Sequence, residues 1–217
     1  MLHNLSHTPS ILGTFVAELR DATVQQDPMR FRFNLKRLGN AMAMEVSKSL
    51  AYVNGEVQTP LAPAPTQRLA NPPVLSTILR AGLPMHEGVA EVFDRSEQAF
   101  VSACRDYVDA AHSAFKIRID AVSAPPLAGR VLFVTDPMLA TGESLVQVLS
   151  SLFASHGTPS EVHVLVAIAS EAGVEAVLKA HPNAHVWAAA VDAELNAQGY
   201  IVPGLGDAGD LAFGSKM

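Results

Sequence analysis

The residues best suited to chemistry lie together in the stretch 130–149. An apolar run at 131–134, typical of a buried parallel strand, is followed closely by the carboxylate of Asp136. A turn of small residues that includes Thr141 then leads into a predicted helix at Ser144. Unpaired N–H groups at the start of a helix bind phosphate, and the two hydroxyls add donors. We therefore predict a phosphate site, with a carboxylate about five residues upstream that accepts hydrogen bonds from sugar hydroxyls or from metal-bound water.

This loop is not a P-loop. A Walker motif has lysine beside its hydroxyl residue, whereas here Glu143 follows Gly142. Taken alone, the loop leaves a second interpretation open, an ordinary connection between strand and helix in which Ser144 caps the helix.

Three separated segments resemble one enzyme family. The run Asp-Pro-Met-Leu-Ala-Thr-Gly at 136–142 is similar to the signature with which type I phosphoribosyltransferases bind 5-phosphoribosyl 1-diphosphate (PRPP), in the form typical of uracil phosphoribosyltransferases. The run Ile-Leu-Arg-Ala-Gly-Leu at 78–83 resembles the pyrophosphate loop of that family, and GYIVPGLGDAG at 199–209 resembles its uracil loop. The matches follow the family's order and extend from about Val74 to the end, whereas the first seventy residues match loosely.

The resemblance implies the site residues. Those binding PRPP would be Arg80, Arg105, Asp136, Pro137, Met138, Leu139, Ala140, Thr141, Gly142, Glu143, Ser144 and Asp207. Those binding uracil would be Ile201, Gly206, Asp207 and Ala208. The catalytic residues would be Arg80, Arg105, Asp136 and Asp207. The resemblance also implies Mg²⁺ as cofactor, held by substrate oxygens and water rather than by a set of protein ligands, and a non-prolyl cis peptide near residues 79–81.

The chain departs from the family's pattern at two places. Around Arg105, Cys104 precedes the arginine and the usual acidic run after it is replaced, so only the arginine is carried over. The segment 106–114 is predicted to be a flexible excursion that closes over substrate, and an exposed hairpin tip without a role is the alternative. Glu143 stands where a small residue is usual, and repulsion from a phosphate predicts that its side chain points outward.

The glycines at 204–209 satisfy the pattern GxGxxG of dinucleotide sites. That pattern must open a long helix within a strand-helix-strand unit, and too few residues follow Gly209. We therefore interpret the glycines as allowing backbone to lie against a flat base, whose edge of donors and acceptors matches amide groups.

Alternating strands and helices predict an α/β fold similar to type I phosphoribosyltransferases, with a mostly parallel central sheet flanked by helices and a C-terminal hood that binds the base. Helices are expected at 10–24, 29–51, 85–93, 144–156 and 172–180, and strands at 74–79, 99–104, 115–122, 131–135, 162–169 and 186–190. The Pro-rich stretch 59–73 is expected to be a loop or an irregular excursion. Arg80, Arg105 and Asp136 each follow a predicted strand, so they should converge at one crevice.

Length and composition predict one domain of 217 residues, with N-terminal helices at about 1–55, a core at about 70–195 and a base-recognition tail at about 195–217. The single cysteine excludes an internal disulfide, and no apolar run approaches the roughly twenty residues of a membrane span, so we expect a cytoplasmic protein. The net charge of −6 disfavours nucleic acids and membranes as partners. The eight histidines show no metal-ligand spacing beyond His181 and His185, between which Pro182 and Asn183 lie, and they are expected at the surface.

The resemblance implies conversion of uracil and PRPP to UMP and pyrophosphate, in pyrimidine salvage, by a homodimer or larger homo-oligomer. Two alternatives stay open. One is transfer to another nucleobase. The other is a pyrimidine-nucleotide-sensing, RNA-binding regulator that retains the PRPP or UMP site, favoured only by the basic and aromatic run at 30–37. Because the whole chain is acidic, a helix that buries one face, or a subunit interface, explains that run better.

Overall fold

An eight-stranded sheet forms the centre of the computed structural model, which describes residues 1–107 and 115–215. Its strands lie in the order β1-β10-β9-β7-β4-β5-β6, with β8 beside β9, and the pairs are parallel except for β5 with β6. The strands are β1 (Leu2–Asn4), β4 (Val74–Leu79), β5 (Gln98–Tyr107), β6 (Phe115–Ser123), β7 (Val131–Thr135), β8 (Met138–Leu139), β9 (Glu161–Ser170) and β10 (Ala184–Asp192). The expected α/β fold with a mostly parallel sheet is confirmed.

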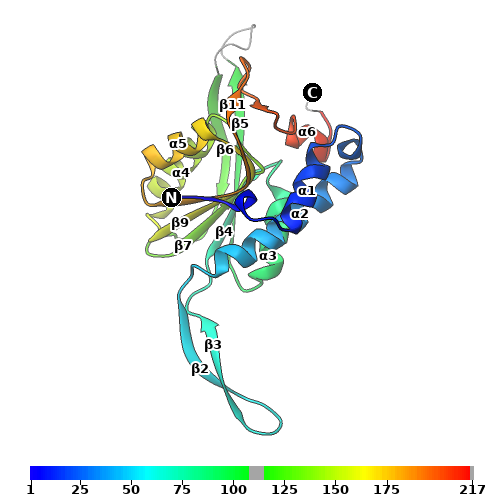
Figure 1. Ribbon diagram of the computed structural model, residues 1–217. Coiled ribbons are helices and arrows are strands. Elements are labelled where there is room, and N and C mark those ends of the chain that lie inside the picture. Colours follow the sequence, from blue (N-terminus) through cyan, green and yellow to red (C-terminus); the bar gives the residue numbers. More distant parts are fainter. Residues whose placement is uncertain (108–114, 216–217) are drawn as a thin grey trace.

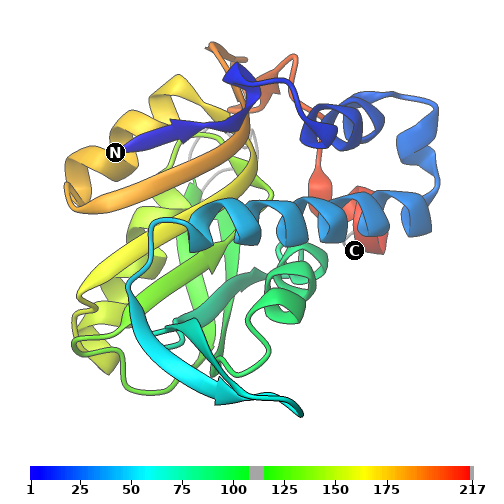
Figure 2. The ribbon, with the colours of Figure 1, turned by 60° about the horizontal axis from the view of Figure 1, so that its bottom comes forward.

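Helices cover both faces of this sheet (Figures 1 and 2). On one face lie α1 (Ile11–Arg20), α2 (Pro28–Ser47) and α3 (Leu83–Val92), and on the other α4 (Glu143–His156) and α5 (Glu171–Ala180). The short helix α6 (Ala208–Phe213) packs on α2, and 3₁₀ turns span Leu5–His7 and Val24–Gln26. Within residues 1–107 and 115–215, none of the helices has both the length and the apolar character needed to cross a membrane.

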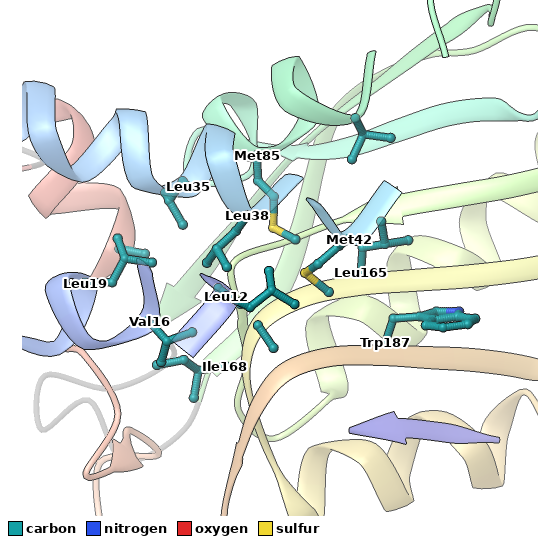
Figure 3. Close-up of a cluster of buried hydrophobic side chains, with 14 of the residues drawn as sticks. Leu12, Val16, Leu19, Leu35, Leu38, Met42, Met85, Leu165, Ile168 and Trp187 are labelled. Atoms are coloured by element: carbon teal, nitrogen blue, oxygen red, sulfur yellow. The ribbon is translucent and has the colours of Figure 1, made fainter. Parts of the chain in front are cut away.

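Successive strand residues point to opposite faces and so divide the core into two layers. Phe133 and Leu165 pack toward α1, α2 and α3, whereas Leu132 and Val164 pack toward α4 and α5. Figure 3 shows the first layer, in which Met85 of α3 and side chains of α2 converge on Leu165. The side chains with no exposed surface include Phe133, Leu165, Leu132, Val164 and Met85. Burial of each contributes roughly 1.5–3 kcal/mol.

The Pro-rich stretch 59–73 is not the loop predicted for it. Strands β2 (Tyr52–Gln58) and β3 (Pro63–Leu69) form an antiparallel hairpin that projects from the body (Figure 1). Pro63 and Pro65 are two positions apart in β3, one strand of a two-stranded ribbon. Proline is tolerated at the outer edge of such a ribbon, because no neighbouring strand there needs an N–H donor. The N-terminal helices accordingly end at Ser47 rather than near residue 55.

Several shorter elements were also not predicted. Strand β1 pairs in parallel with β10 at the edge of the sheet, and the tail contributes β11 (Glu194–Leu195), β12 (Ile201–Val202) and α6. Strand β5 continues to Tyr107, so the backbone at 106–107 is extended rather than an excursion. The rest of the predicted flexible segment, 108–114, lies outside the described residues.

The expectation that the histidines lie at the surface is wrong for His86 and His163, which are 3% and 0% exposed. The Trp187 indole N–H donates to His163 Nδ1 at 3.0 Å, and His163 Nε2 lies 3.1 Å from Glu161 Oε1. Burial, together with the nearby charges of His185 and His3, lowers the pKa of His163 to about 3. His163 is therefore a neutral core residue.

Acid should destabilise the fold through His163. Its pKa of about 3 in the folded chain lies below the unfolded value of about 6.5, so the unfolded chain binds more protons between these pH values. The free energy of unfolding should fall as the pH is lowered through this range, by at most about 1.4 kcal/mol per pH unit from this group. Urea titrations from pH 7 to 4.5, followed by Trp187 fluorescence, measure the slope. His163→Gln should reduce the slope of unfolding free energy against pH, and His7→Gln, at an exposed site, should leave it unchanged. The same slope in both variants would contradict the role given to His163.

Candidate active site

A cleft of about 370 Å³ lies at the carboxyl ends of β4 and β7. Three segments that the sequence singled out line it together: 78–81, the loop from 136 to 145, and 199–210 of the tail. Ala103, Cys104 and Ile117 of β5 and β6 line a further part. The predicted convergence at one crevice is therefore observed for Arg80 and Asp136.

The predicted phosphate loop is held in place by backbone packing against α5. Gly142, the N-cap of α4, has a φ of 80°, and a Cβ there would lie 2.8 Å from the Gly173 carbonyl oxygen. The Ser170 hydroxyl donates to the Ala140 carbonyl at 2.6 Å and accepts from Gly173 N–H at 2.8 Å. One hydroxyl thus caps α5 and fixes the loop. Gly142, Ser144 and Leu145 line the cleft, so the start of α4 lies at it, as a phosphate site requires.

Asp136 lies directly beyond the tip of β7. Its backbone N–H donates to Leu165 O at 3.2 Å, and its Oδ1 accepts from Met138 N–H at 3.3 Å. The next residues form β8 on β9, which fixes the direction of the loop. The carboxylate therefore belongs to the cleft lining and immediately precedes the phosphate loop.

Arg80 connects the loop after β4 with the tail. The Leu79-Arg80 peptide bond is cis, which confirms the prediction for this loop. Arg80 Nη2 lies 3.4 Å from Asp210 Oδ1 and donates to Gly214 O at 3.2 Å. Both charged side chains are about two-fifths exposed, so the pair contributes at most about 1 kcal/mol and is easily exchanged for a ligand.

The tail presents backbone to the other side of the cleft. Ile201 belongs to β12, which pairs with β11, and Asp207 caps α6 by accepting from Asp210 N–H at 3.0 Å. Gly206 between them has a φ of 92°, a conformation that favours glycine. Backbone donors and acceptors can thus lie against a flat ligand here.

Most of the predicted site residues lie on this cleft. Its lining includes Arg80, Asp136, Met138, Leu139, Ala140, Thr141, Gly142, Ser144, Ile201, Gly206, Asp207 and Ala208. Pro137 is buried beside it, and Glu143 is exposed at the start of α4, outside the lining, as its charge predicted. Arg105 lies in β5 opposite Ile117, and its side chain lies outside the described residues.

Sequence reasoning missed several contributors, and Tyr200 and Ser170 are two examples. Tyr200 lines the cleft. Its position next to Ile201 was the only signal of this in the sequence. Ser170 was missed although a serine after a strand, three residues before Gly173, has the pattern of a helix cap. Its second bond, to Ala140, depends on packing and leaves no local signal.

The charge of the cleft limits how an anionic ligand is held. Among the described lining residues, Arg80 is accompanied by three carboxylates, those of Asp136, Asp207 and Asp210. The described residues also contain no group of three side chains able to hold a metal ion. This donor set suits Mg²⁺ that arrives on phosphate oxygens, with the carboxylates accepting from its waters.

Comparisons with known proteins agree with this geometry. Residues 6–215 match the family model for uracil phosphoribosyltransferase, so the match includes the first seventy residues that had seemed only loosely similar. The chain is 44% identical to a uracil phosphoribosyltransferase of Porphyromonas gingivalis, covering 96% of this chain and 95% of the relative. It is 40% identical to one of Methanothermobacter thermautotrophicus, covering 87% and 85%.

Solved structures share the fold. A protein of Aquifex aeolicus superposes with a TM-score of 0.87 at 29% identity, covering 99% of this chain and 98% of that one. A hypoxanthine phosphoribosyltransferase of Staphylococcus aureus has a TM-score of 0.50 at 10% identity, covering 74% of each chain, and shows the fold alone.

Proposed function

The chain belongs to the uracil phosphoribosyltransferase family, and on this premise we propose that its cleft transfers the phosphoribosyl group of PRPP to uracil, giving UMP and pyrophosphate. One observation carries the proposal: the phosphate loop at 136–145 and the tail at 199–210 line the same cleft. A single nucleotide can therefore reach both.

Different residues of the cleft would bind the phosphate, the ribose and the pyrophosphate of the substrate. The 5′-phosphate would bind the amides at the start of α4 and the hydroxyls of Thr141 and Ser144, and the ribose hydroxyls would donate to Asp136. Arg80, and Arg105 by resemblance, would bind the pyrophosphate. Pro137, Met138, Leu139, Ala140, Gly142 and Glu143 would contribute as loop backbone.

Catalysis would depend on placement and electrostatics. The bond from ribose C1 to the pyrophosphate oxygen breaks, and its electrons leave with pyrophosphate. Uracil N1 attacks C1 from the opposite face, and the N1 proton passes to solvent water. The tail would hold uracil for this attack through Ile201, Gly206, Asp207 and Ala208, whose backbone groups can match the base edge. Positive charge near the departing group lowers the barrier.

Magnesium fits this arrangement as a cofactor brought by the substrate. When bound, it neutralises charge on the pyrophosphate oxygens. Asp136 and Asp207 would orient its waters without forming a protein cage, in keeping with the donor set described above.

The test is to incubate the protein with PRPP, Mg²⁺ and each of uracil, cytosine, hypoxanthine and orotate. UMP and pyrophosphate should form with uracil, and the other bases should react at least about 10³-fold more slowly, because unpaired donors and acceptors in the site reject them. If none of the four bases gives a nucleotide, the proposed transferase activity is wrong. If another base reacts faster than uracil, the proposed substrate is wrong.

The RNA-binding alternative has lost its one supporting feature. Phe31 of the basic and aromatic run is buried, and Arg30 donates to Glu18 Oε2 at 2.7 Å. Arg32 donates to Ala212 O at 2.6 Å, and Arg37 donates to Asn34 Oδ1 at 3.1 Å. The basic side chains of the run therefore have partners within the chain.

We further propose that the hairpin β2–β3 binds a second copy of the chain. An isolated two-stranded ribbon is marginally stable in water, and this one exposes Tyr52, Val53 and Leu61 at 46%, 52% and 96%. Sedimentation should give a dimer or larger for the natural chain, and a monomer when a two-residue turn replaces residues 54–67. A monomeric natural chain, or an unchanged mass after shortening, would contradict this.

Two earlier expectations stay predictions. They are the cytoplasmic location and the organisation as one domain.

A further inference from the structure

Arg20 and Asp192 form an ion pair behind the base-recognition loop. Arg20 is the last residue of α1, and Asp192 is the last residue of β10. Their bond is bidentate, with Arg20 Nη1 donating to Asp192 Oδ2 at 2.7 Å and Nη2 donating to Oδ1 at 2.8 Å. The side chains are 23% and 9% exposed, so the pair is largely removed from solvent.

The same pair binds both backbone polar groups of Gly204. Arg20 Nη1 donates to the Gly204 carbonyl at 3.0 Å, and the Gly204 N–H donates to Asp192 Oδ2 at 3.0 Å. Burial alone would raise the pKa of Asp192, but the hydrogen bonds from Arg20 and Gly204 hold that pKa below its usual value. The carboxylate is therefore charged at neutral pH and accepts all of these bonds.

Gly204 lies at a turn within the base-recognition loop and sets the direction of the chain there. It follows the cis Val202-Pro203 bond and has a φ of 55°, and a Cβ on it would lie 2.1 Å from Ile201 O. The described lining of the cleft includes Ile201 before it and Gly206 after it. Gly204 is thus held by the ion pair, while Ile201 and Gly206 line the cleft.

A second contact comes from the same part of the chain. The carboxamide of Gln25, oriented to donate, reaches the Leu205 carbonyl oxygen at 2.9 Å. Leu205 itself is 4% exposed and belongs to the core layer that contains α1. Residues 20–25 therefore hold two consecutive positions of the loop.

We propose that Arg20 and Asp192 are positioning residues that set the backbone of the base-recognition loop, so that the N-terminal helix α1 determines how uracil is held. This inference rests on the proposed function of the cleft. It assigns the effect to uracil rather than to PRPP, because the phosphate loop is fixed separately through Ser170.

The test replaces Arg20 with lysine, which keeps the charge and loses the bidentate geometry. The matched control is Arg30→Lys, because Arg30 makes an equally short bidentate pair with Glu18, at 2.7 and 2.7 Å, between α1 and α2. Arg20→Lys should raise the KM for uracil at least about tenfold, because misplaced binding groups lose much of their effect. PRPP affinity, measured by calorimetry without uracil, should fall by less than the KM for uracil rises, because Asp207 is the one proposed PRPP contact on this loop. Arg30→Lys should change neither.

Amide hydrogen exchange gives a readout that does not need turnover. Exchange at residues 201–208 should become at least about tenfold faster in Arg20→Lys and stay unchanged in Arg30→Lys. If Arg20→Lys does not fold, Asp192→Asn is judged by the same criteria. Equal uracil KM values or equal exchange in the two arginine variants would overturn the inference, as would a loss of PRPP affinity as large as the rise in uracil KM. A natural chain that makes no UMP would refute the proposed function, and the exchange result would still decide whether the pair fixes the loop.

Discussion

Arg80→Met should lower kcat/KM for PRPP by about 10²- to 10³-fold, the effect expected when one charge that stabilises a transition state is removed. Methionine keeps the apolar stem and loses the guanidinium. The contacts that disappear, to Asp210 at 3.4 Å and Gly214 at 3.2 Å, are partly exposed, so stability should change little. The variant should therefore fold normally and fail in turnover. Steady-state rates with varied PRPP, together with a thermal unfolding curve, measure both.

The matched control is Arg130→Met. Arg130 pairs with Glu97 at 2.6 Å and immediately precedes β7, at the opposite end of the strand from the cleft. This variant should keep its activity within about twofold. An Arg80→Met variant as active as Arg130→Met would remove Arg80 from the proposed reaction.

The features that the sequence predicted depend on residues that lie close together in the chain. Asp27 and Pro28 indicated the start of α2, and Asp27 Oδ1 does accept from the N–H groups of Met29 and Arg30, at 2.9 and 3.2 Å. The apolar run of β7, the acid after it and the glycine before α4 likewise lie within a short stretch. Such signals need no knowledge of the rest of the fold.

The features that were missed depend on partners far away in the chain. Strand β1 has three residues and exists because it pairs with Val186 and its neighbours on β10. Arg20 and Asp192 are 172 residues apart, so neither residue's surroundings predicts the other. The burial of His163 follows from the stacking of neighbouring strands and helices, which a histidine by itself does not indicate.

Gly142→Ala should abolish most activity, because the phosphate loop and α5 touch through backbone atoms. A Cβ on Gly142 would lie 2.8 Å from Gly173 O, and Gly173 is equally confined, with its own added Cβ 2.3 Å from Ala140 O. Since neither side can yield by rotating a side chain, the loop itself must shift. A displacement of about 1 Å at a binding group can reduce the rate about 10²-fold, so a loss of at least that size in kcat/KM for PRPP is expected.

Gly129→Ala separates this clash from backbone strain. Gly129 has a φ of 72°, close to the 80° of Gly142, but has no atoms within 4 Å of an added Cβ. Both variants should lose about 1–2 kcal/mol of stability from the left-handed conformation. Only Gly142→Ala should lose PRPP affinity, measured by calorimetry on the folded proteins. Equal PRPP affinity in the two variants would mean that the loop does not bind the phosphate as proposed, because the added methyl group at residue 142 must displace the loop from its position against Gly173.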